Sequence, residues 1–344
     1  PPQPVRAAIV LVNLGTPAAP TTPAVRKYLA EFLWDPRVID TARWLWWLVL
    51  NLVVLRLRPP RSARAYQQVW SDGGSPLQVG TRALADKLHE QFTGEFGDQV
   101  IVRHAMRYGE PSVPTTMREL GALGVRRMLF IPLFPQFSAT TTASVLDCVG
   151  AELRNWRYPP ELRFVNDYHD QPAHIEALAR SVEAHWIAKG RGQRLMLSFH
   201  GIPQRYVRDG DPYRDQCGVT AERVRERLGL SEEELILSFQ SRVGREPWLQ
   251  PYTDKTLEAL PGQGVKRIDA MCPGFSIDCL ETLEEIAIEG RDSFLEAGGE
   301  RFEYIGSLND SDDQVASIAA LVRRHVQGWP EFERMVASGA GVGD

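Results

Sequence analysis

The chain has 344 residues, of which 43% are apolar and 24% charged, an ordinary balance for a globular protein with room for two domains. The formal net charge is −5, and no long Lys/Arg run occurs that could neutralise a row of phosphates, so we expect no nucleic-acid partner. The cysteines form no CxxC pair, which favours a reduced, cytoplasmic compartment; they are Cys148, Cys217, Cys272 and Cys279.

Short runs of apolar and β-branched residues predict six strands, at residues 7–14, 100–106, 127–133, 194–200, 235–239 and 267–271. Helical patterns alternate with these runs, as at residues 81–92 and 172–189. This alternation predicts an α/β fold with parallel sheets flanked by helices. Because open parallel sheets bind ligands at the carboxyl ends of their strands, residues that end strands are the first candidates for a site.

One segment departs from the ordinary composition. Residues 44–55 read Trp44-Leu-Trp-Trp-Leu-Val-Leu-Asn-Leu-Val-Val-Leu55, and four arginines follow at Arg56, Arg58, Arg61 and Arg64. The segment is too short to span a bilayer, for which about 20 apolar residues are needed. Two interpretations stay open, a buried core helix and a segment that lies at the water–lipid boundary, where tryptophan and flanking arginine are favoured.

Two motifs of the first half of the chain are repeated in the second half. Ile9-Val-Leu-Val-Asn-Leu-Gly-Thr-Pro17 resembles Leu195-Met-Leu-Ser-Phe-His-Gly-Ile-Pro203, and Phe134-Pro-Gln-Phe-Ser138 resembles Cys272-Pro-Gly-Phe-Ser276, in the same order. We interpret this as two copies of one α/β unit with a ligand between them. The first copy is longer, and its excess contains the tryptophan-rich segment, which predicts a lip over the cleft.

These patterns predict a domain organisation. We expect an N-terminal α/β domain over residues 1–165, with the apolar lip inserted at about 34–76, and a C-terminal α/β domain over residues 166–310. A helix at about 312–327 should pack back on the first domain, so that residues 311–344 form this helix and a flexible tail.

His200 is the first candidate for chemistry, because it ends a predicted strand and is followed by Gly201. A helix should open directly after the second Pro-Gly-Phe-Ser turn, and α-helical spacing would put Glu281, Glu285 and Glu289 on one face. A core or capping histidine and a solvated acidic face are the ordinary interpretations. The functional one is a carboxylate row that attracts a hydrated divalent cation or relays protons, with Asp278 near its start.

Histidine and carboxylate ligands suit Fe2+, Zn2+ or Co2+ without trapping the metal as thiolates would. The same groups can move protons near neutral pH, and a hydrolase could also use them.

Longer motifs are more specific. Leu197-Ser-Phe-His-Gly-Ile-Pro203, Ser238-Phe-Gln-Ser-Arg-Val-Gly244 and Cys272-Pro-Gly-Phe-Ser-Ile-Asp-Cys-Leu-Glu-Thr-Leu-Glu-Glu285 resemble those of ferrochelatases, particularly the type found in Gram-negative bacteria. The resemblance extends from near the start of the chain to about residue 310. It implies a lyase that inserts Fe2+ into protoporphyrin IX to give protohaem, the terminal step of haem biosynthesis, in a cleft between two Rossmann-like, chelatase-like domains.

The resemblance also assigns residues. It implies that His200 and Glu281 are catalytic and contact the metal, with Asp278, Glu285 and Glu289 as a relay. The residues that it implies in the porphyrin pocket are Leu14, Arg58, Arg61, Tyr66, Ser75, Arg107, Tyr108, Ser138 and Trp248, of which Arg58 and Arg61 would face the propionates.

The chain departs from the animal enzymes of the family at two points. No cysteine-bearing extension follows residue 310, so we expect no [2Fe-2S] cluster and no permanent cofactor, with Fe2+ as substrate. Cys279 stands where those enzymes carry a histidine, which argues against a histidine relay there. Besides cytoplasmic location, the sequence predicts peripheral contact with the inner face of a membrane through residues 44–55.

Several alternatives stay open at this point. The substrate could be coproporphyrin, the enzyme could be a cobalt chelatase of corrinoid synthesis, or the protein could be a non-catalytic porphyrin or haem carrier with His200 as axial ligand. The sequence does not choose between His200 as base and His200 as first iron ligand. It also leaves open the face from which iron enters and the oligomeric state.

Overall fold

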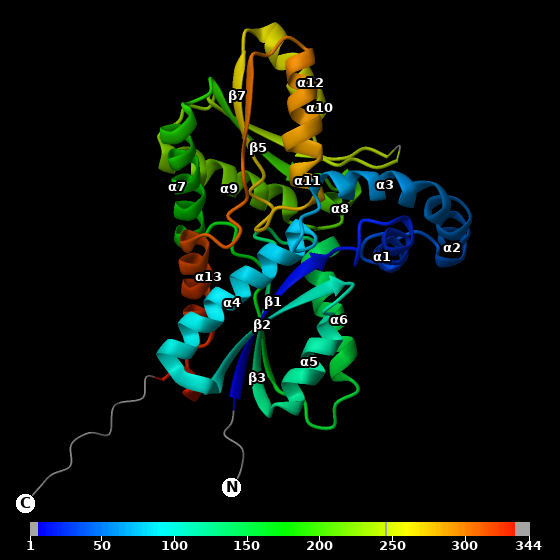
Figure 1. Cartoon of the computed structure of the whole chain (residues 1–344), viewed down its shortest axis with the longest axis vertical. Coiled ribbons are helices and arrows are strands. Elements are labelled where there is room, and N and C mark those ends of the chain that lie inside the picture. Colours follow the sequence, from blue (N-terminus) through cyan, green and yellow to red (C-terminus); the bar gives the residue numbers. More distant parts are fainter. Residues whose placement is uncertain (1–5, 245, 334–344) are drawn as a thin grey trace, which may run out of the picture.

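The computed structural model describes residues 6–244 and 246–333, which form two parallel four-stranded sheets, one above the other in Figure 1. The first sheet has the order β2-β1-β3-β4, with β1 (Arg6–Gly15), β2 (Val100–Tyr108), β3 (Val125–Pro132) and β4 (Glu161–Phe164). The second has the order β6-β5-β7-β8, with β5 (Arg194–His200), β6 (Leu235–Gln240), β7 (Arg267–Met271) and β8 (Arg301–Ile305). The identical order confirms two copies of one α/β unit, and the predicted fold class is confirmed.

Helices cover both faces of each sheet because the central strands are apolar on both sides. Ile9 and Leu11 of β1 pack under α4 (Pro76–Phe96), whereas Val10 and Val12 pack on the opposite face, under α5 (Val113–Ala122) and α6 (Ser144–Leu153). The second sheet has α7 (Pro172–Lys189) and α9 (Tyr213–Leu228) on one face, and α10 (Thr253–Ala259) and α12 (Arg291–Glu296) on the other.

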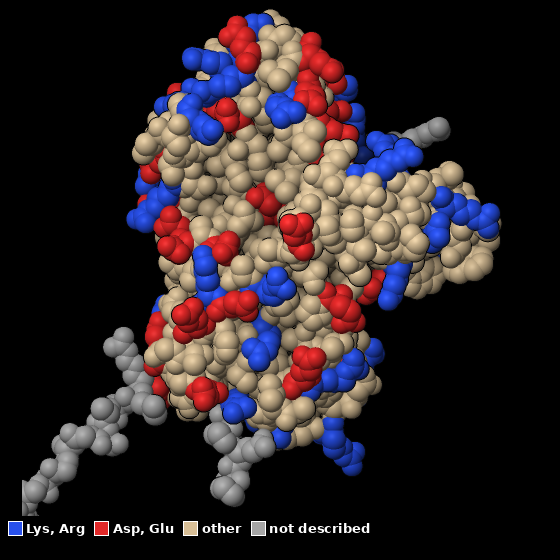
Figure 2. All heavy atoms as spheres, in the orientation of Figure 1, with Lys and Arg blue, Asp and Glu red and all other residues tan. Residues whose placement is uncertain are grey.

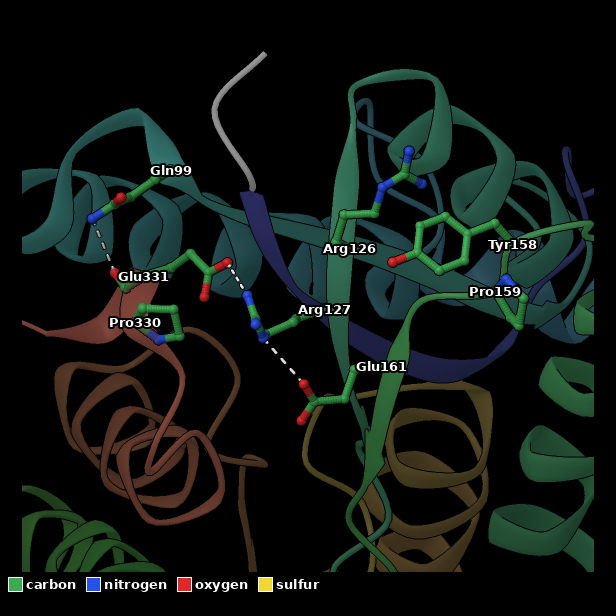
Figure 3. Close-up of a pocket in the computed structure, with 8 residues that line it drawn as sticks. All are labelled: Gln99, Arg126, Arg127, Tyr158, Pro159, Glu161, Pro330 and Glu331. Atoms are coloured by element: carbon green, nitrogen blue, oxygen red, sulfur yellow. Dashed lines mark hydrogen bonds and ion pairs between the residues drawn. The ribbon is translucent and has the colours of Figure 1, made fainter. Parts of the chain in front are cut away.

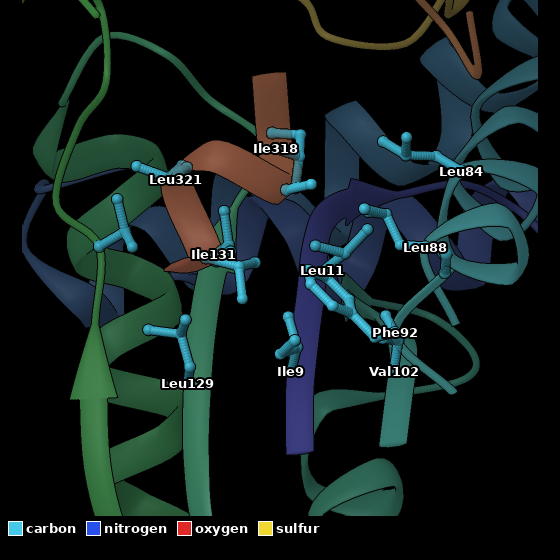
Figure 4. Close-up of a cluster of buried hydrophobic side chains, with 14 of the residues drawn as sticks. Ile9, Leu11, Leu84, Leu88, Phe92, Val102, Leu129, Ile131, Ile318 and Leu321 are labelled. Carbon is cyan, nitrogen blue, oxygen red and sulfur yellow. The ribbon is translucent and has the colours of Figure 1, made fainter. Parts of the chain in front are cut away.

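The last long helix, α13 (Asp312–His325), follows the second sheet but packs on the first. Ile318 and Leu321 of this helix lie in the same apolar cluster as Ile9 and Leu11 of β1, as Figure 4 shows. This helix, which follows the second unit, therefore packs against the first strand of the first unit. The expected flexible tail after residue 336 lies outside the described residues.

A helical projection leaves the first unit between β1 and α4 (Figure 1). It comprises α1 (Thr22–Trp34), α2 (Arg43–Val49), a π-helical turn (Leu50–Val54) and α3 (Leu55–Val69). Its inner face is packed, since Leu50 is only 2% exposed and clusters with α1. Its outer face is open, since Trp44 is 72% and Leu57 73% exposed. The projection is thus amphipathic, with one face packed against α1 and the other exposed, so residues 44–55 do not form a fully buried core helix.

The carboxyl ends of the two sheets meet at the base of this projection. Leu14, near the end of β1, lies in one apolar cluster with Tyr66 of α3 and with Leu280 of α11 (Leu280–Leu283), the short helix after β7. On the other side, Ser138 of the first unit donates to Asp211 of the second over 2.9 Å. A ligand held at the strand ends would therefore contact both units and the projection.

Candidate active site

His200 ends β5 and is half-buried, beside Gln240 at the end of β6. Its Nδ1 lies 2.6 Å from the carbonyl oxygen of Gly201. Because a carbonyl oxygen can only accept, Nδ1 carries the hydrogen, and in the neutral imidazole the lone pair is on Nε2. Gly201 is needed here, since a Cβ atom would lie 2.9 Å from the backbone oxygen of Gln240 and 3.3 Å from the ring of Trp248.

The carboxylate-bearing helix after β7 is not a regular α-helix. After α11, residues 285–290 form a π-helix, in which the amide of Glu289 donates to the carbonyl of Glu284 over 2.9 Å. The expected α-helical spacing of Glu281, Glu285 and Glu289 was therefore wrong, because a π-helix has a wider turn. Such π-helical turns are rare and occur frequently at functional sites.

Glu281 lies within electrostatic reach of the projection and of Glu285, and Glu285 lies within reach of His200. Burial raises the pKa of Tyr66 well above its ordinary value, and the charge of Glu281 raises it further. Burial also raises the pKa of Glu285, which donors from Ser241 and the charge of His200 counteract. Two carboxylates thus connect the projection to the imidazole. Glu289, in contrast, is exposed.

Glu284 is an additional acidic residue that the sequence pattern did not single out. Burial, followed by the charges of Glu289 and Glu285, raises its pKa to about 7, and the charge of Arg61 on α3 opposes this shift. Glu284 thus lies between the other carboxylates and Arg61 of the projection. This position depends on the π-helical turn, which the sequence did not predict.

Asp278 lies at the start of the same segment and is surrounded by donors. Its carboxylate accepts from the hydroxyl groups of Thr282 (2.9 Å) and Tyr304 (2.7 Å), from the backbone amide of Ser307 (3.2 Å) and from the side chain of Asn309 (2.8 Å). This network joins α11 to β8 and the loop that follows it. The contacts support an anchoring role for the segment that carries Glu281.

We expect Asp278→Ala to lower the free energy of unfolding by about 2 to 4 kcal/mol, because it leaves several buried or half-buried donors without their acceptor. Urea unfolding measures this loss. The control is Asp292→Ala, whose carboxylate pairs with Arg291 at the surface and should cost less than about 1 kcal/mol. Unchanged stability with lost turnover would instead assign Asp278 to the relay.

The structure brings only some of the expected pocket residues to the meeting point of the sheets. Leu14 and Tyr66 lie in the apolar cluster there, and Trp248 packs against Gly201. Arg58 and Arg61 are exposed on α3, where their charges act on Tyr66 and Glu284 respectively. Trp248 thus lies beside the end of β5, and the other four lie beside α11 and the π-helical turn that follows it.

The other expected pocket residues are committed to buried contacts. Arg107 pairs with Asp35 and donates to the hydroxyl of Ser144 over 2.7 Å, and the hydroxyl of Tyr108 donates to Asp35 over 2.8 Å. Ser138 donates to Asp211, and Ser75 is 1% exposed directly before α4. In this state, therefore, they support the walls of the site.

The four cysteines lie in or against four different apolar clusters. Cys148 packs with α5, Cys217 of α9 with α7 and Cys272 with α10, whereas Cys279 joins the cluster of α4. They therefore do not gather at one point. In the described part of the chain, no group of three or more His, Cys, Asp and Glu side chains forms a metal site.

A pocket of about 560 Å³ lies elsewhere, at the amino ends of β2, β3 and β4 (Figure 3). Three of its charged residues already pair, since Arg127 contacts Glu331 at 2.6 Å and Glu161 at 3.1 Å, and Arg126 lies over the ring of Tyr158. Ligands of parallel sheets bind at the opposite, carboxyl edge, so we do not assign the active site to this pocket.

The fold is that of a chelatase. A solved structure of SirB from Bacillus subtilis has a TM-score of 0.53 with this chain at 12% identity, covering 93% of this chain and 95% of that one. The ferrochelatase family model matches residues 6–326. A ferrochelatase of Marinobacter nauticus is 52% identical over 327 residues, covering 95% of this chain and 88% of that protein. One of Methylibium petroleiphilum is 53% identical over 325 residues, covering 94% and 89% respectively.

The chain therefore belongs to the ferrochelatase family, as the motifs indicated. Its relatives come from Gram-negative bacteria, which confirms the expected type. It is an enzyme that inserts a metal ion into a porphyrin.

Proposed function

We propose that this chain inserts Fe2+ into protoporphyrin IX to give protohaem, with His200 and Glu281 acting on the porphyrin and the metal. The observation that carries the proposal is the place of His200 at the meeting point of the two sheets, where its Nδ1 is held by Gly201 and its charge acts on the half-buried carboxylate of Glu285. A flat apolar ring with two propionates fits an apolar wall, supplied by the cluster of Leu14 and Tyr66, and a basic rim at Arg58 and Arg61.

In this mechanism His200 accepts protons from the pyrrole nitrogens. The hydrogen bond from Nδ1 to Gly201 fixes the tautomer, so that Nε2 faces the ring as a base. A ring bent out of its plane exposes these nitrogens, and the pocket stabilises the bent form at the expense of binding energy. His200 as first iron ligand is the alternative assignment, and it uses the same nitrogen.

Glu281 and Glu285 are proposed to conduct protons or the metal between the site and solvent. Glu289, which is exposed, would form the solvent end of this row. His200 and Glu281 both act electrostatically on Glu285, which makes Glu285 the middle of this row. Oxygen and nitrogen ligands hold Fe2+ without trapping it, because they are harder than thiolates. Asp278 is proposed to contribute to the relay by holding the segment that carries Glu281 in place, because four donors bind its carboxylate.

Anaerobic incubation of the purified protein with metal-free porphyrin tests this proposal. The expected result is multiple turnover with Fe2+ and protoporphyrin IX, with slower reaction on coproporphyrin. Stoichiometric binding without turnover would indicate a carrier. Preference for Co2+ and a corrinoid precursor would indicate a cobalt chelatase.

The projection is proposed to make a peripheral membrane contact at the inner face of the membrane. Figure 2 shows it largely free of charged atoms, with Lys and Arg atoms at its end and edge. Its outer face exposes Trp44, Trp47 and Leu52, and Arg56 and Arg64 follow on α3. Tryptophan favours the headgroup level and arginine favours anionic lipid. Among the described residues, no helix is long and apolar enough to cross a bilayer.

We expect the triple variant Trp44→Ser, Trp47→Ser, Leu52→Ser to fold normally and to bind anionic liposomes at least about tenfold more weakly. The three side chains are 72%, 50% and 51% exposed, so their loss leaves the core intact. Trp46 is unsuitable for this purpose, since its Nε1 donates to the carbonyl of Leu33 over 2.7 Å, and Leu50 is buried.

A matched control replaces three exposed apolar residues outside the projection, Leu123, Ile187 and Leu295, by serine. This variant should bind liposomes as the parent does. Co-sedimentation with vesicles measures both. Equal binding by the projection variant and the parent would refute the membrane contact.

A further inference from the structure

Ser241 follows β6 and has a backbone conformation that serine rarely adopts. Its φ is 64°, in the left-handed region, and among the described residues only Asn309 shares this feature outside glycine. Left-handed conformations of such residues cost about 1 to 3 kcal/mol and persist where the surrounding structure enforces them. The cost at Ser241 therefore calls for a compensating contact.

That contact is Glu285. The backbone amide of Ser241 donates to Oε1 of Glu285 over 2.7 Å, and its hydroxyl donates to Oε2 in a short hydrogen bond. One residue thus holds both carboxylate oxygens, which is feasible because the left-handed backbone turns its amide and its side chain to the same side. Charge-assisted bonds of this kind are about twice as strong as neutral ones.

Gln240 completes the arrangement from the strand itself. Its side-chain amide donates to the backbone oxygen of Glu281 over 2.7 Å and approaches Oε2 of Glu285 at 3.4 Å, while its own oxygen accepts from Ser198 over 2.7 Å. Gln240 is also the partner of His200 in the register of the sheet. The end of β6 therefore fixes the π-helical segment relative to the imidazole.

We propose that Ser241 is a positioning residue that fixes the carboxylate of Glu285 beside His200, and that it acts on catalysis through Glu285. The inference rests on the proposed function of Glu285 in the relay. It goes beyond that function by giving a specific role to a serine that would otherwise be one more polar group near the porphyrin.

A double-mutant cycle between Ser241 and Glu285 tests the proposal. Ser241→Gly removes the hydroxyl and folds safely, because glycine adopts a φ of 64° without strain; Ser241→Ala removes the same hydroxyl. Both should lower kcat by about ten- to a hundredfold, the range for one hydrogen bond to a charged group, with the KM for porphyrin unchanged. In the Glu285→Ala background, neither should lower kcat further.

The control is Ser231→Ala, which removes the hydroxyl of a serine in the exposed turn before β6, where its backbone amide donates to Glu234 over 2.9 Å. It should leave kcat and KM unchanged. Additive losses in the cycle, or a raised KM for porphyrin, would mean that Ser241 contacts the substrate itself and would overturn the proposal. If both Ser241 variants turned over normally while Glu285→Ala was impaired, the positioning role of Ser241 would be overturned and the relay through Glu285 would stand. Normal turnover of Glu285→Ala would reject the relay, and the positioning role with it.

Discussion

His200→Ala is expected to lower kcat by a factor of about 10² to 10⁴ while porphyrin still binds, because the variant loses the proton acceptor and keeps the walls of the pocket. His200 is half-buried, and the hydrogen bond from its Nδ1 goes to the neighbouring residue, Gly201, so little of the fold depends on it. Anaerobic turnover with Fe2+ gives kcat, and quenching of the variant's fluorescence by porphyrin gives binding. Near-normal turnover would contradict the mechanism.

Two comparisons sharpen this experiment. His185→Ala, on the outer helix α7, changes the same residue type away from the site and should keep normal turnover. Adding free imidazole to His200→Ala should restore part of the activity if a base is missing. If instead His200 is the first iron ligand, the defect should appear mainly as a raised KM for Fe2+.

The positions of the strand ends were predictable because apolar runs mark buried parallel strands whatever their partners are. This is why the sequence located His200 and its counterpart in the first copy, Leu14, and why the repeated order of strands agrees with the repeated motifs. The edge strands β4 and β8 were missed. They have four and five residues with a mixed polar pattern, so they become strands only through pairing with β3 and β7.

Partners distant in sequence explain the remaining differences. Arg107 was expected to line the porphyrin pocket, but the structure pairs it with Asp35, a contact for which the sequence gives no signal. The π-helical turn at residues 285–290 likewise depends on tertiary contacts, including those of Glu285 with Ser241. Gln240 and Ser241 lie in a motif that resembles the family, and their place at a strand end could have identified them as candidates.

Glu281→Gln is expected to lower kcat by about 10² or more with little change in stability, because the amide keeps the shape of the side chain and removes its charge. Glu281 lies in the first turn of α11, half-buried, and its charge acts on Tyr28 and Tyr66 of the projection as well as on Glu285. Without it, the row of carboxylates is interrupted between the projection and His200. Turnover with Fe2+ at saturating porphyrin measures the loss, and urea unfolding measures stability.

Glu296→Gln provides the matched control, since this residue is exposed at the end of α12 and makes the same chemical change away from the site. The two interpretations of Glu281 then predict different pairs of results. A solvated acidic face predicts unchanged turnover for both variants and equal or higher stability for Glu281→Gln, because removing one of several neighbouring like charges relieves repulsion. A functional carboxylate predicts loss of turnover for Glu281→Gln alone, with its stability within a few tenths of a kcal/mol of the parent, so turnover decides between the two interpretations.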